Sequence, residues 1–272
     1  MTRAMPGVLK YGSLAIAAVV VLLPLSVVLF ASFKSREEYA TTGPLTPPQN
    51  WLNFDNFIDA AVQGDMVAGF VNTTIVLVIS LAGTIMIGTM AAYAVDRFAF
   101  RGRRLVLALF LIATLIPSVT SQVATFQIIS GLGLYNTKAA LVLLFMGTDI
   151  IAIYIFIQFM QSIPVSLDEA AMLDGANRWT IYWRIVLPLL KPAIATVVII
   201  KGIAIYNEFY LPFLYLQSES VISTALFRFK GPFGAQWELI AAATILVIVP
   251  TVIAFVFLQK WIYKGLVAGA VK

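Results

Sequence analysis

The sequence predicts an all-α integral membrane protein with six transmembrane helices. Of its 272 residues, 61% are hydrophobic and only 11% are charged, whereas a soluble domain is roughly 45–50% apolar and about 25% charged. A helix that crosses a membrane needs about 20 mostly apolar residues. Six segments meet this requirement, at residues 11–33, 70–95, 105–129, 139–160, 193–216 and 239–258.

The composition also limits the chemistry that the chain can perform. Cysteine and histidine are both absent, which excludes disulfide bonds, thiol nucleophiles, histidine metal sites and histidine acid–base catalysis. The net charge is +5, but nothing else in the sequence indicates a nucleic-acid partner. The segments between the spans are too short for a large soluble domain, so residues 1–272 are expected to form a single transmembrane domain.

The first span and the loop that follows it have distinct features. Arg3 and Lys10 precede the apolar run 11–33, which exceeds the 7–15-residue core of a cleavable signal peptide. A retained first span is therefore expected. Residues 34–69 form the longest loop, in which TTGPLTPPQNW is typical of extended chain and FDNFIDA predicts a short interfacial helix.

The positive charges predict the orientation in the membrane, because cytoplasmic loops carry an excess of Lys and Arg. With the N-terminus in the cytoplasm, twelve such residues lie on the cytoplasmic side: Arg3, Lys10, Arg97, Arg101, Arg103, Arg104, Arg178, Arg184, Lys191, Lys260, Lys264 and Lys272. Five lie on the other side: Lys34, Arg36, Lys138, Arg228 and Lys230. Both termini, the loop 161–192 and the C-terminal tail 260–272 are therefore expected to be cytoplasmic.

Three ionisable residues fall within the predicted spans: Asp149, Lys201 and Glu208. Such residues often mark transport pathways or proton relays. Lys201 lies about two turns from the cytoplasmic end of its span and is expected to snorkel to the surface. Glu208 lies about two turns from the opposite end of the same span. It is expected either to have a functional role or to be an ordinary polar residue near the membrane surface. The two residues are about 10 Å apart along the helix, too far for a direct ion pair.

Prolines and glycines within the spans have a simpler interpretation. Pro24, Pro117 and Pro250 interrupt spans one, three and six, and Gly83 and Gly88 lie in span two. Such residues permit kinks and close contacts between helices. They do not identify a functional site.

The loop 161–192 contains two predicted helical pieces. Ser166 and Glu169 have the spacing of a capping box, which predicts that a helix begins near Leu167. The alanines that follow favour a helix with little side-chain bulk, and Gly175 ends it after about two turns. The second piece, residues 178–186, is aromatic and basic, with Arg178, Trp179, Ile181, Tyr182, Trp183, Arg184 and Ile185.

Two interpretations of this loop compete. An amphipathic connector at the membrane surface explains the aromatic and basic side chains of the second piece. It does not explain the small, acidic first piece, because carboxylates are unfavourable near an anionic lipid surface. A short helix with small side chains is better suited to a groove on another protein.

The spacing of the loop resembles a family signature. The loop contains Glu169-Ala170-Ala171, followed after three residues by Gly175, after nine more by Ile185 and after one more by Leu187-Pro188. This spacing is similar to the EAA loop of permease subunits of ATP-binding-cassette (ABC) importers. Further segments resemble the six-span second permease of maltose-type sugar importers: GLGLYNTKAALVL, QSIPVSLDEAAMLDGA, WRIVLPLLKPA, YNEFYLPF and the terminal GLVAGAVK. The resemblance covers nearly the whole chain.

The resemblance implies the type I permease fold of ABC importers, with a loop whose coupling helices dock into a cytoplasmic ATPase. The residues expected at this contact are Glu169, Ala170, Ala171, Asp174, Gly175, Ile185, Leu187 and Pro188. The tail is expected to reach into the ATPase dimer through Gly265, Gly269 and Lys272.

The sequence lacks the G-x-x-x-x-G-K-[ST] phosphate loop that binds ATP. ATP and Mg are therefore expected on the partner ATPase. The chain itself is not expected to be an enzyme or to hold a cofactor. The partners that the resemblance implies are a second permease subunit, two cytoplasmic ABC ATPase subunits, an extracytoplasmic solute-binding protein, a sugar and membrane lipid. The implied location is the bacterial plasma membrane.

Residues 206–213 are the candidate lining of the translocation path. Tyr206, Asn207, Glu208 and Tyr210 supply the aromatic faces and hydrogen-bonding groups that bind sugars. Here YNEF replaces the more usual Trp-Asn-Asp-Phe of the family. The loop 217–237 resembles one that probes the sugar site of the external binding protein; an exposed connector is the alternative.

Two other classes of protein remain open. An ion-coupled secondary transporter would use Asp149 or Glu208 as a coupling carboxylate, but such folds commonly contain inverted repeats, and no convincing internal repeat is visible. The other class is a membrane scaffold without a transport role.

Overall fold

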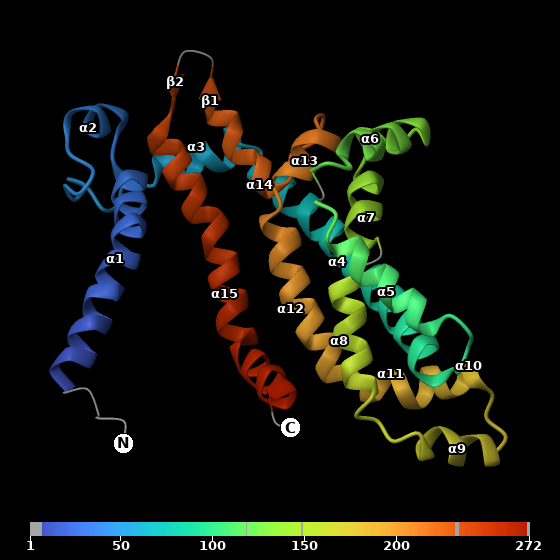
Figure 1. The fold of residues 1–272 in the computed structure, drawn as a ribbon. Helices are drawn as coiled ribbons and strands as arrows, with labels where there is room; N and C mark the ends of the chain where they lie inside the picture. The colour runs from blue at the N-terminus through green and yellow to red at the C-terminus, as the bar shows by residue number, and fades with distance from the viewer. Residues whose placement is uncertain (1–6, 118, 148, 232–233, 271–272) are drawn as a thin grey trace. The chain divides into compact units, whose positions relative to one another are not determined.

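The computed structural model describes residues 7–117, 119–147, 149–231 and 234–270, with side chains described as far as residue 257 except that of Val8. The α-helices, shown in Figure 1, are α1 (Gly7–Phe33), α2 (Arg36–Thr41), α3 (Asp55–Gln63), α4 (Met66–Arg97), α5 (Arg103–Thr114), α6 (Gln122–Gly131), α7 (Lys138–Met146), α8 (Ile150–Met160), α9 (Ser166–Leu173), α10 (Arg178–Ile181), α11 (Leu187–Leu189), α12 (Lys191–Asn207), α13 (Tyr210–Tyr215), α14 (Ile222–Ala225) and α15 (Trp237–Ala270). A π-helix (Tyr182–Val186), a 3₁₀ helix (Leu226–Phe229) and an antiparallel pair of strands, β1 (Lys230–Gly231) and β2 (Gly234–Ala235), complete the described elements.

The chain divides into two compact units. The first comprises Met1–Gly69 and Thr224–Ile253, and the second comprises Phe70–Ser223 and Ala254–Lys272. Each unit has its own packing and is described separately. The loop 161–192 and the residues predicted to line the path all belong to the second unit.

In the first unit, polar contacts order the loop that follows α1. The Lys34 side chain is 1% exposed, and its Nζ donates to Thr42 Oγ1 and to the Gly43 carbonyl, both at 2.9 Å. The amide of Asn56 donates to the carbonyls of Ser32 and Lys34, at 3.0 and 2.7 Å. Asn56 lies in α3, so the predicted short helix in this loop is confirmed and is held against the end of α1.

Three of the predicted spans are confirmed as long apolar helices. The described helices that could cross a membrane by themselves are Leu9–Phe33, Met66–Arg97 and Trp237–Phe257, and two bent pairs of helices would raise the number to five. Pro24 and Pro250 lie inside α1 and α15, which continue through them. The prediction of six spans is therefore confirmed for the first, second and sixth alone.

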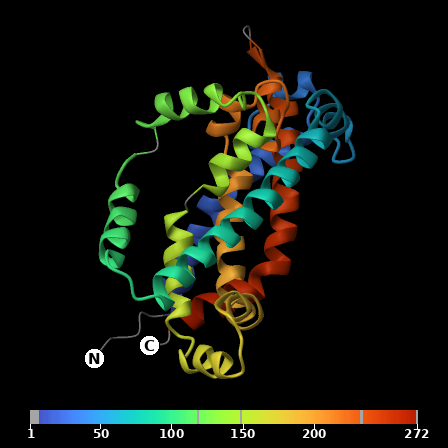
Figure 2. The same ribbon diagram turned by 90° about the vertical axis from the view of Figure 1, so that its right-hand side faces the viewer.

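The predicted third span, 105–129, is two helices. α5 has 12 residues and α6 has 10, so at 1.5 Å per residue they are about 18 and 15 Å long, too short to cross a membrane alone. Figure 2 shows α6 turned away from the direction of α5. Pro117 lies in the connection, and because proline lacks an N–H and restricts the preceding residue, it favours such a break.

The predicted fourth and fifth spans are broken at polar residues. Gly147 ends α7, and the Asp149 carboxylate accepts a hydrogen bond from the Ala152 amide at 2.9 Å, which caps the start of α8. In the fifth, α12 ends at Asn207, and the Glu208 carboxylate accepts from the Tyr210 amide at 2.8 Å at the start of α13. Each carboxylate accepts from backbone amides at a helix start, and these amides would have had intrahelical partners in a continuous span.

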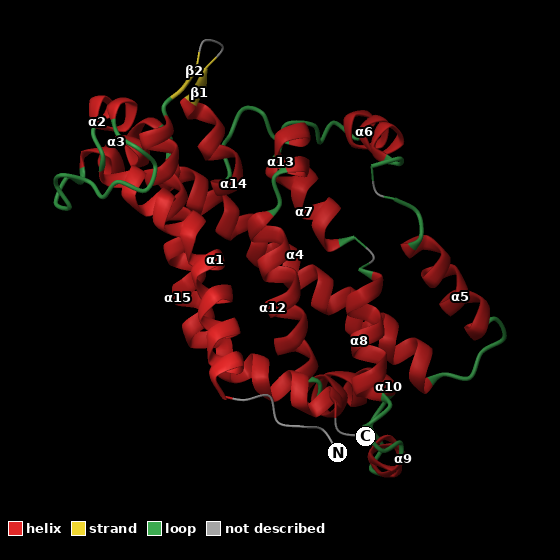
Figure 3. Cartoon of the chain, turned by 60° about the vertical axis from the view of Figure 1, so that its left-hand side comes forward, coloured by secondary structure: helices red, strands yellow, loops and turns green. Residues whose placement is uncertain are grey.

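The second unit has two hydrophobic clusters along α4. One contains Tyr93, Phe156 and Tyr182, and the other contains Val76, Leu141 and Tyr215. A Cβ atom at Gly88 would lie 2.9 Å from Phe156 Cε2, so this glycine allows the close approach of α4 and α8 that the sequence indicated. Figure 3 shows α9 and α6 at opposite ends of this unit.

Candidate functional site

The first helix of the loop 161–192 begins differently from the prediction. α9 starts at Ser166, with Val165 as its N-cap and no side-chain capping bond, so the capping box of Ser166 and Glu169 is wrong. The Glu169 amide instead donates to the Val165 carbonyl at 3.1 Å, and the Asp168 amide donates to the same carbonyl at 2.9 Å. Because backbone carbonyls already accept from these amides, the Ser166 hydroxyl is not needed as a cap.

The end of α9 confirms the predicted break. Gly175 has a φ of +82°, in the left-handed region that glycine adopts at little cost. The Ala176 amide donates to the Ala171 carbonyl at 2.9 Å, and the Gly175 amide donates to that of Met172 at 3.0 Å, as in common C-terminal caps that use a glycine. The backbone therefore requires glycine here, independently of any partner.

The two faces of α9 differ in exposure. Asp168 is 0% exposed and Ala171 is 9% exposed. The opposite face is open: Leu173 is 90% exposed, and Glu169, Ala170, Met172, Asp174 and Gly175 are also exposed. The exposed face thus combines carboxylates, small residues and an accessible leucine, a composition suited to a protein groove.

The second half of the loop is α10, the π-helix and α11 rather than one α-helix. Asn177 caps α10 by accepting from the Thr180 amide at 2.8 Å. Pro188 has no amide hydrogen to donate to the fourth residue before it, which favours the wider turn. Ile185 and Leu187 pack against the cluster around Phe156, whereas Pro188 is exposed. Two of the predicted coupling residues therefore fix the loop to its own unit.

Two residues that hold this loop, Arg97 and Asp168, were not predicted from the sequence. Arg97 Nε lies 3.1 Å from Asp168 Oδ2, and the side chains are 3% and 0% exposed. Arg97 also donates from Nη2 to the Ile163 carbonyl at 2.8 Å and from Nη1 to Asp96 Oδ2 at 2.7 Å. The geometry between Arg97 Nε and Asp168 is that of an ion pair rather than a hydrogen bond.

A signal for the burial of Asp168, though not for its partner, was present in the sequence. Asp168 and Ala171 share one face of a helix by their spacing, and a face that buries an alanine also buries the aspartate beside it. The sequence prediction gave a role to Glu169 alone and none to Asp168. Their environments differ, because Glu169 is exposed and Asp168 is fully buried.

Lys201 has a partner that the sequence did not predict. Its Nζ forms an ion pair with Asp149 Oδ2, and the two side chains are 25% and 9% exposed. The break between α7 and α8 places Asp149 beside α12, where it neutralises the lysine. Glu208 is not part of this pair, in agreement with its expected distance from Lys201.

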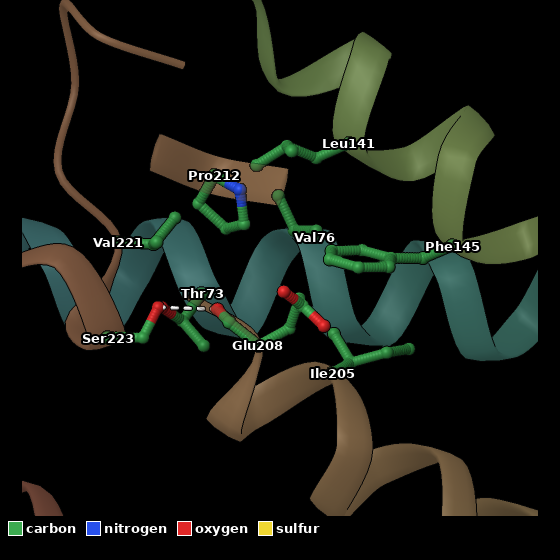
Figure 4. A pocket seen from close by; sticks show the side chains of 9 residues that line it. All are labelled: Thr73, Val76, Leu141, Phe145, Ile205, Glu208, Pro212, Val221 and Ser223. Atoms are coloured by element: carbon green, nitrogen blue, oxygen red, sulfur yellow. Dashed lines mark hydrogen bonds between the residues drawn. The ribbon is translucent and has the colours of Figure 1, made fainter. Parts of the chain in front are cut away.

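The four predicted path residues have different environments. Glu208 lines a small cavity with residues of α4, α7 and the chain after α13, as Figure 4 shows. This cavity has room for about one water molecule. Asn207 and Tyr210 are exposed, and Tyr206 is half-buried. The second unit alone therefore does not enclose a sugar with these residues.

Residues 84–267 match the family model described as "Binding-protein-dependent transport system inner membrane component". The chain belongs to this family. It is therefore a membrane permease component of a transport system, and the matched region includes α8 to α12 with the whole loop 161–192.

Curated relatives of this permease extend over nearly its full length. The melibiose/raffinose/stachyose import permease protein MelC of Bacillus subtilis is 32% identical over 95% of this chain and 94% of its own. The galactooligosaccharides transport system permease protein GanQ of the same organism is 31% identical over 97% and 94%. A probable permease for starch degradation products, AmyC of Thermoanaerobacterium thermosulfurigenes, is 31% identical over 92% and 91%.

Solved structures show the same fold. A chain in the crystal structure of a bacterial ABC transporter that imports the acidic polysaccharide alginate superposes with a TM-score of 0.81, at 21% identity, over 93% of this permease and 95% of that chain. A second structure of such an alginate transporter, in complex with a periplasmic protein bound to an alginate pentasaccharide, gives a TM-score of 0.65 at 20% identity, over 93% of each chain.

The C-terminal residues of the permease remain a prediction. Gly265 and Gly269 lie in the last part of α15, for which the backbone alone is described. Lys272 lies outside the described residues. Their expected contact with an ATPase dimer therefore has no geometry in this structure.

Proposed function

We propose that this chain is a transmembrane permease subunit of an ATP-driven ABC importer for sugars or oligosaccharides in the bacterial plasma membrane. It forms half of the translocation path together with a second permease subunit. The family supports the transport role, and the named sugars of its curated relatives support the substrate class. The orientation with both termini in the cytoplasm follows from the distribution of Lys and Arg.

ATP is bound and hydrolysed by two cytoplasmic ABC ATPase subunits, because the chain has no phosphate loop of its own. An extracytoplasmic solute-binding protein delivers the sugar. The loop 217–237 contacts this protein, and Tyr206, Asn207, Glu208 and Tyr210 contribute to the path. Asn207 and Tyr210 are exposed on the isolated chain, which leaves them accessible to a second permease or to a sugar between the two subunits.

The observation that carries this proposal is the exposed face of α9. Leu173 is 90% exposed beside the carboxylates of Glu169 and Asp174, while Asp168 on the opposite face is held by Arg97. A helix fixed on one side and open on the other can dock without losing its position. Glu169, Ala170, Leu173, Asp174 and Gly175 therefore form the coupling surface for an ATPase cleft.

Purification of the tagged permease with its complex tests the proposal. The variants are Glu169→Lys and Leu173→Ala, and the matched control for charge reversal is Glu37→Lys, at an exposed position of α2. Both α9 variants are expected to lose ATPase from the purified complex and to reduce uptake of labelled oligosaccharide by about tenfold or more, equivalent to about 1.4 kcal/mol of coupling. The second permease should stay bound.

Gly175 is a poorer probe, because any side chain there is strained at its φ of +82°. If the Glu169→Lys and Leu173→Ala variants both keep a full complement of ATPase and normal uptake, the proposed docking surface is wrong. A wild-type chain that transports without any ATPase would favour an ion-coupled secondary transporter.

A further inference from the structure

α4 runs without a break through the second unit, unlike the other predicted spans there. It has 32 residues, so its length is about 48 Å at 1.5 Å per residue. By contrast, α5 and α6, α7 and α8, and α12 and α13 are each separated by a break, as Figure 3 shows for the described residues. A continuous helix resists shortening, because its hydrogen bonds run along its axis, whereas a break can absorb movement.

The Arg97 end of α4 contacts both halves of the loop 161–192. Arg97 pairs with Asp168 of α9 and donates to the Ile163 carbonyl. One turn earlier, the Tyr93 hydroxyl donates to the Arg178 carbonyl at 3.4 Å. Further along the helix, Thr89 Oγ1 lies 2.8 Å from the Tyr182 hydroxyl of the π-helix in a buried hydrogen bond. Three positions on α4 thus hold the coupling loop by polar contacts.

The Met66 end of α4 holds a different segment, at the start of the loop 217–237. Asn72 Nδ2 donates to the Ser220 carbonyl at 3.0 Å, and Thr73 Oγ1 accepts from the Ile222 amide at 2.8 Å. Lys138 Nζ donates to Asn72 Oδ1 at 2.8 Å and pairs with Glu219 at 2.8 Å. Asn72 and Thr73 are 8% and 5% exposed, so these hydrogen bonds are shielded from water.

The spans that continue from the coupling loop are less suited to transmit movement. The helical stretch Arg178–Leu189 meets α12 at an angle of 69°, and α12 then ends at Asn207. α8 ends at Met160, before the turn that leads to α9. These connections are covalent, but each passes through a bend or a turn.

We propose that α4 passes movement between the ATPase-docking loop and the extracytoplasmic segment 217–223, with Arg97 and the pair Asn72 and Thr73 as the positioning residues at its two ends. This inference rests on the proposed function and adds to it. Spans four and five are the neighbours of the loop 161–192 in the chain. The structure assigns a third helix that contacts both segments through side chains.

The absence of cysteine from the chain allows a direct test with single spin labels. Leu167→Cys places a label on α9 at an exposed position outside the proposed docking surface, and Gln217→Cys places one on the exposed start of the extracytoplasmic segment. Each label is measured in the purified complex with the ATPase, second permease and binding protein. ATP with orthovanadate should change the mobility of both labels.

Two variants, each with a control, then test the contacts at the two ends of α4 separately. Asn72→Ala/Thr73→Ala removes the hydrogen bonds to residues 220 and 222, and its control Thr74→Ala removes a hydroxyl that donates to Phe70 in the same helix. Arg97→Lys keeps the charge but loses the forked geometry of the guanidinium, and its control is Arg104→Lys, at an exposed position.

We expect the ATP-dependent change at residue 217 to fall at least threefold in Asn72→Ala/Thr73→Ala and in Arg97→Lys, with the change at residue 167 retained in the former. The controls should match the wild type. The inference is overturned if the change at residue 217 persists in Asn72→Ala/Thr73→Ala, a variant that leaves the coupling loop intact. Failure of the proposed function is distinguishable, because the wild-type complex would then lack ATPase.

Discussion

The loop 161–192 and the segment 206–210 both interrupt the apolar sequence with polar residues, but the structure buries key side chains of the loop and exposes those of the segment. In the loop, Asp168, Tyr182 and Leu190 are at most 1% exposed, and buried charges and hydroxyls fix the backbone. In the segment, Asn207 and Tyr210 are exposed, and the adjacent cavity suits about one water molecule. The chain therefore determines the shape of the loop 161–192 by itself, whereas the segment 206–210 presents an open surface.

The largest expected effect comes from removing one of the buried charges that hold the loop 161–192. Arg97→Met leaves the fully buried Asp168 carboxylate without its counter-ion, so we expect a loss of about 3–5 kcal/mol in stability, measured by thermal unfolding of the purified complex. Arg104→Met at an exposed position should have little effect. The double variant Arg97→Met/Asp168→Leu should recover part of the loss, because it removes the Asp168 charge, while Asp96 keeps Arg103 at 3.9 Å. A double variant as unstable as the single one would argue against the ion pair.

A smaller effect is expected at the end of α9. Gly175→Ala places a Cβ at a φ of +82°, which costs about 1–2 kcal/mol. The matched control is Gly131→Ala in α6, where the φ is not positive and no atom lies within 4 Å of the added Cβ. The control should be neutral or slightly stabilising. Equal unfolding temperatures for the two variants would contradict the left-handed conformation of Gly175.

The smallest expected effects on stability come from one tyrosine in the loop 161–192 and one in the segment 206–210. Tyr182→Phe removes the buried hydrogen bond to Thr89 and should cost about 1 kcal/mol. Tyr210→Phe, at a position 42% exposed, should leave the unfolding temperature unchanged. If Tyr210 contributes to the path, its variant should alter oligosaccharide uptake at unchanged stability. A stability loss at Tyr210 with normal uptake would reverse this assignment.

Continuous apolar runs were predicted well because span length is a local property. Spans one, two and six appear as long helices, even through Pro24 and Pro250. The third span failed at Pro117, and the fourth and fifth broke at Asp149 and Glu208, where a carboxylate caps a new helix. Hydropathy averages over such residues, so it does not detect a break that a single side chain stabilises.

In the candidate site, too, local features were predicted and contacts between separate helices were not. Small residues and Gly175 predicted α9 and its end, because propensity and backbone conformation act within a few residues. The pairs formed by Arg97 with Asp168 and by Lys201 with Asp149 could not be predicted, because each joins side chains from separate helices. The predicted cap at Ser166 was wrong for a local reason, since the preceding turn already supplied the carbonyls.

The π-helix at Tyr182–Val186 gives the loop 161–192 one place where its length can change without a change in direction. An α-helix rotates by about 100° per residue, and a π-turn accommodates one residue more than an α-turn. Deletion of one residue here would therefore leave an ordinary α-helix with its two ends in their present register, and Tyr182 would still face Thr89. Deletion of one residue from α10 has no wider turn to absorb it, so it would rotate the start of α10 by about 100° relative to Tyr182. The same change in length thus has opposite consequences on the two sides of Tyr182.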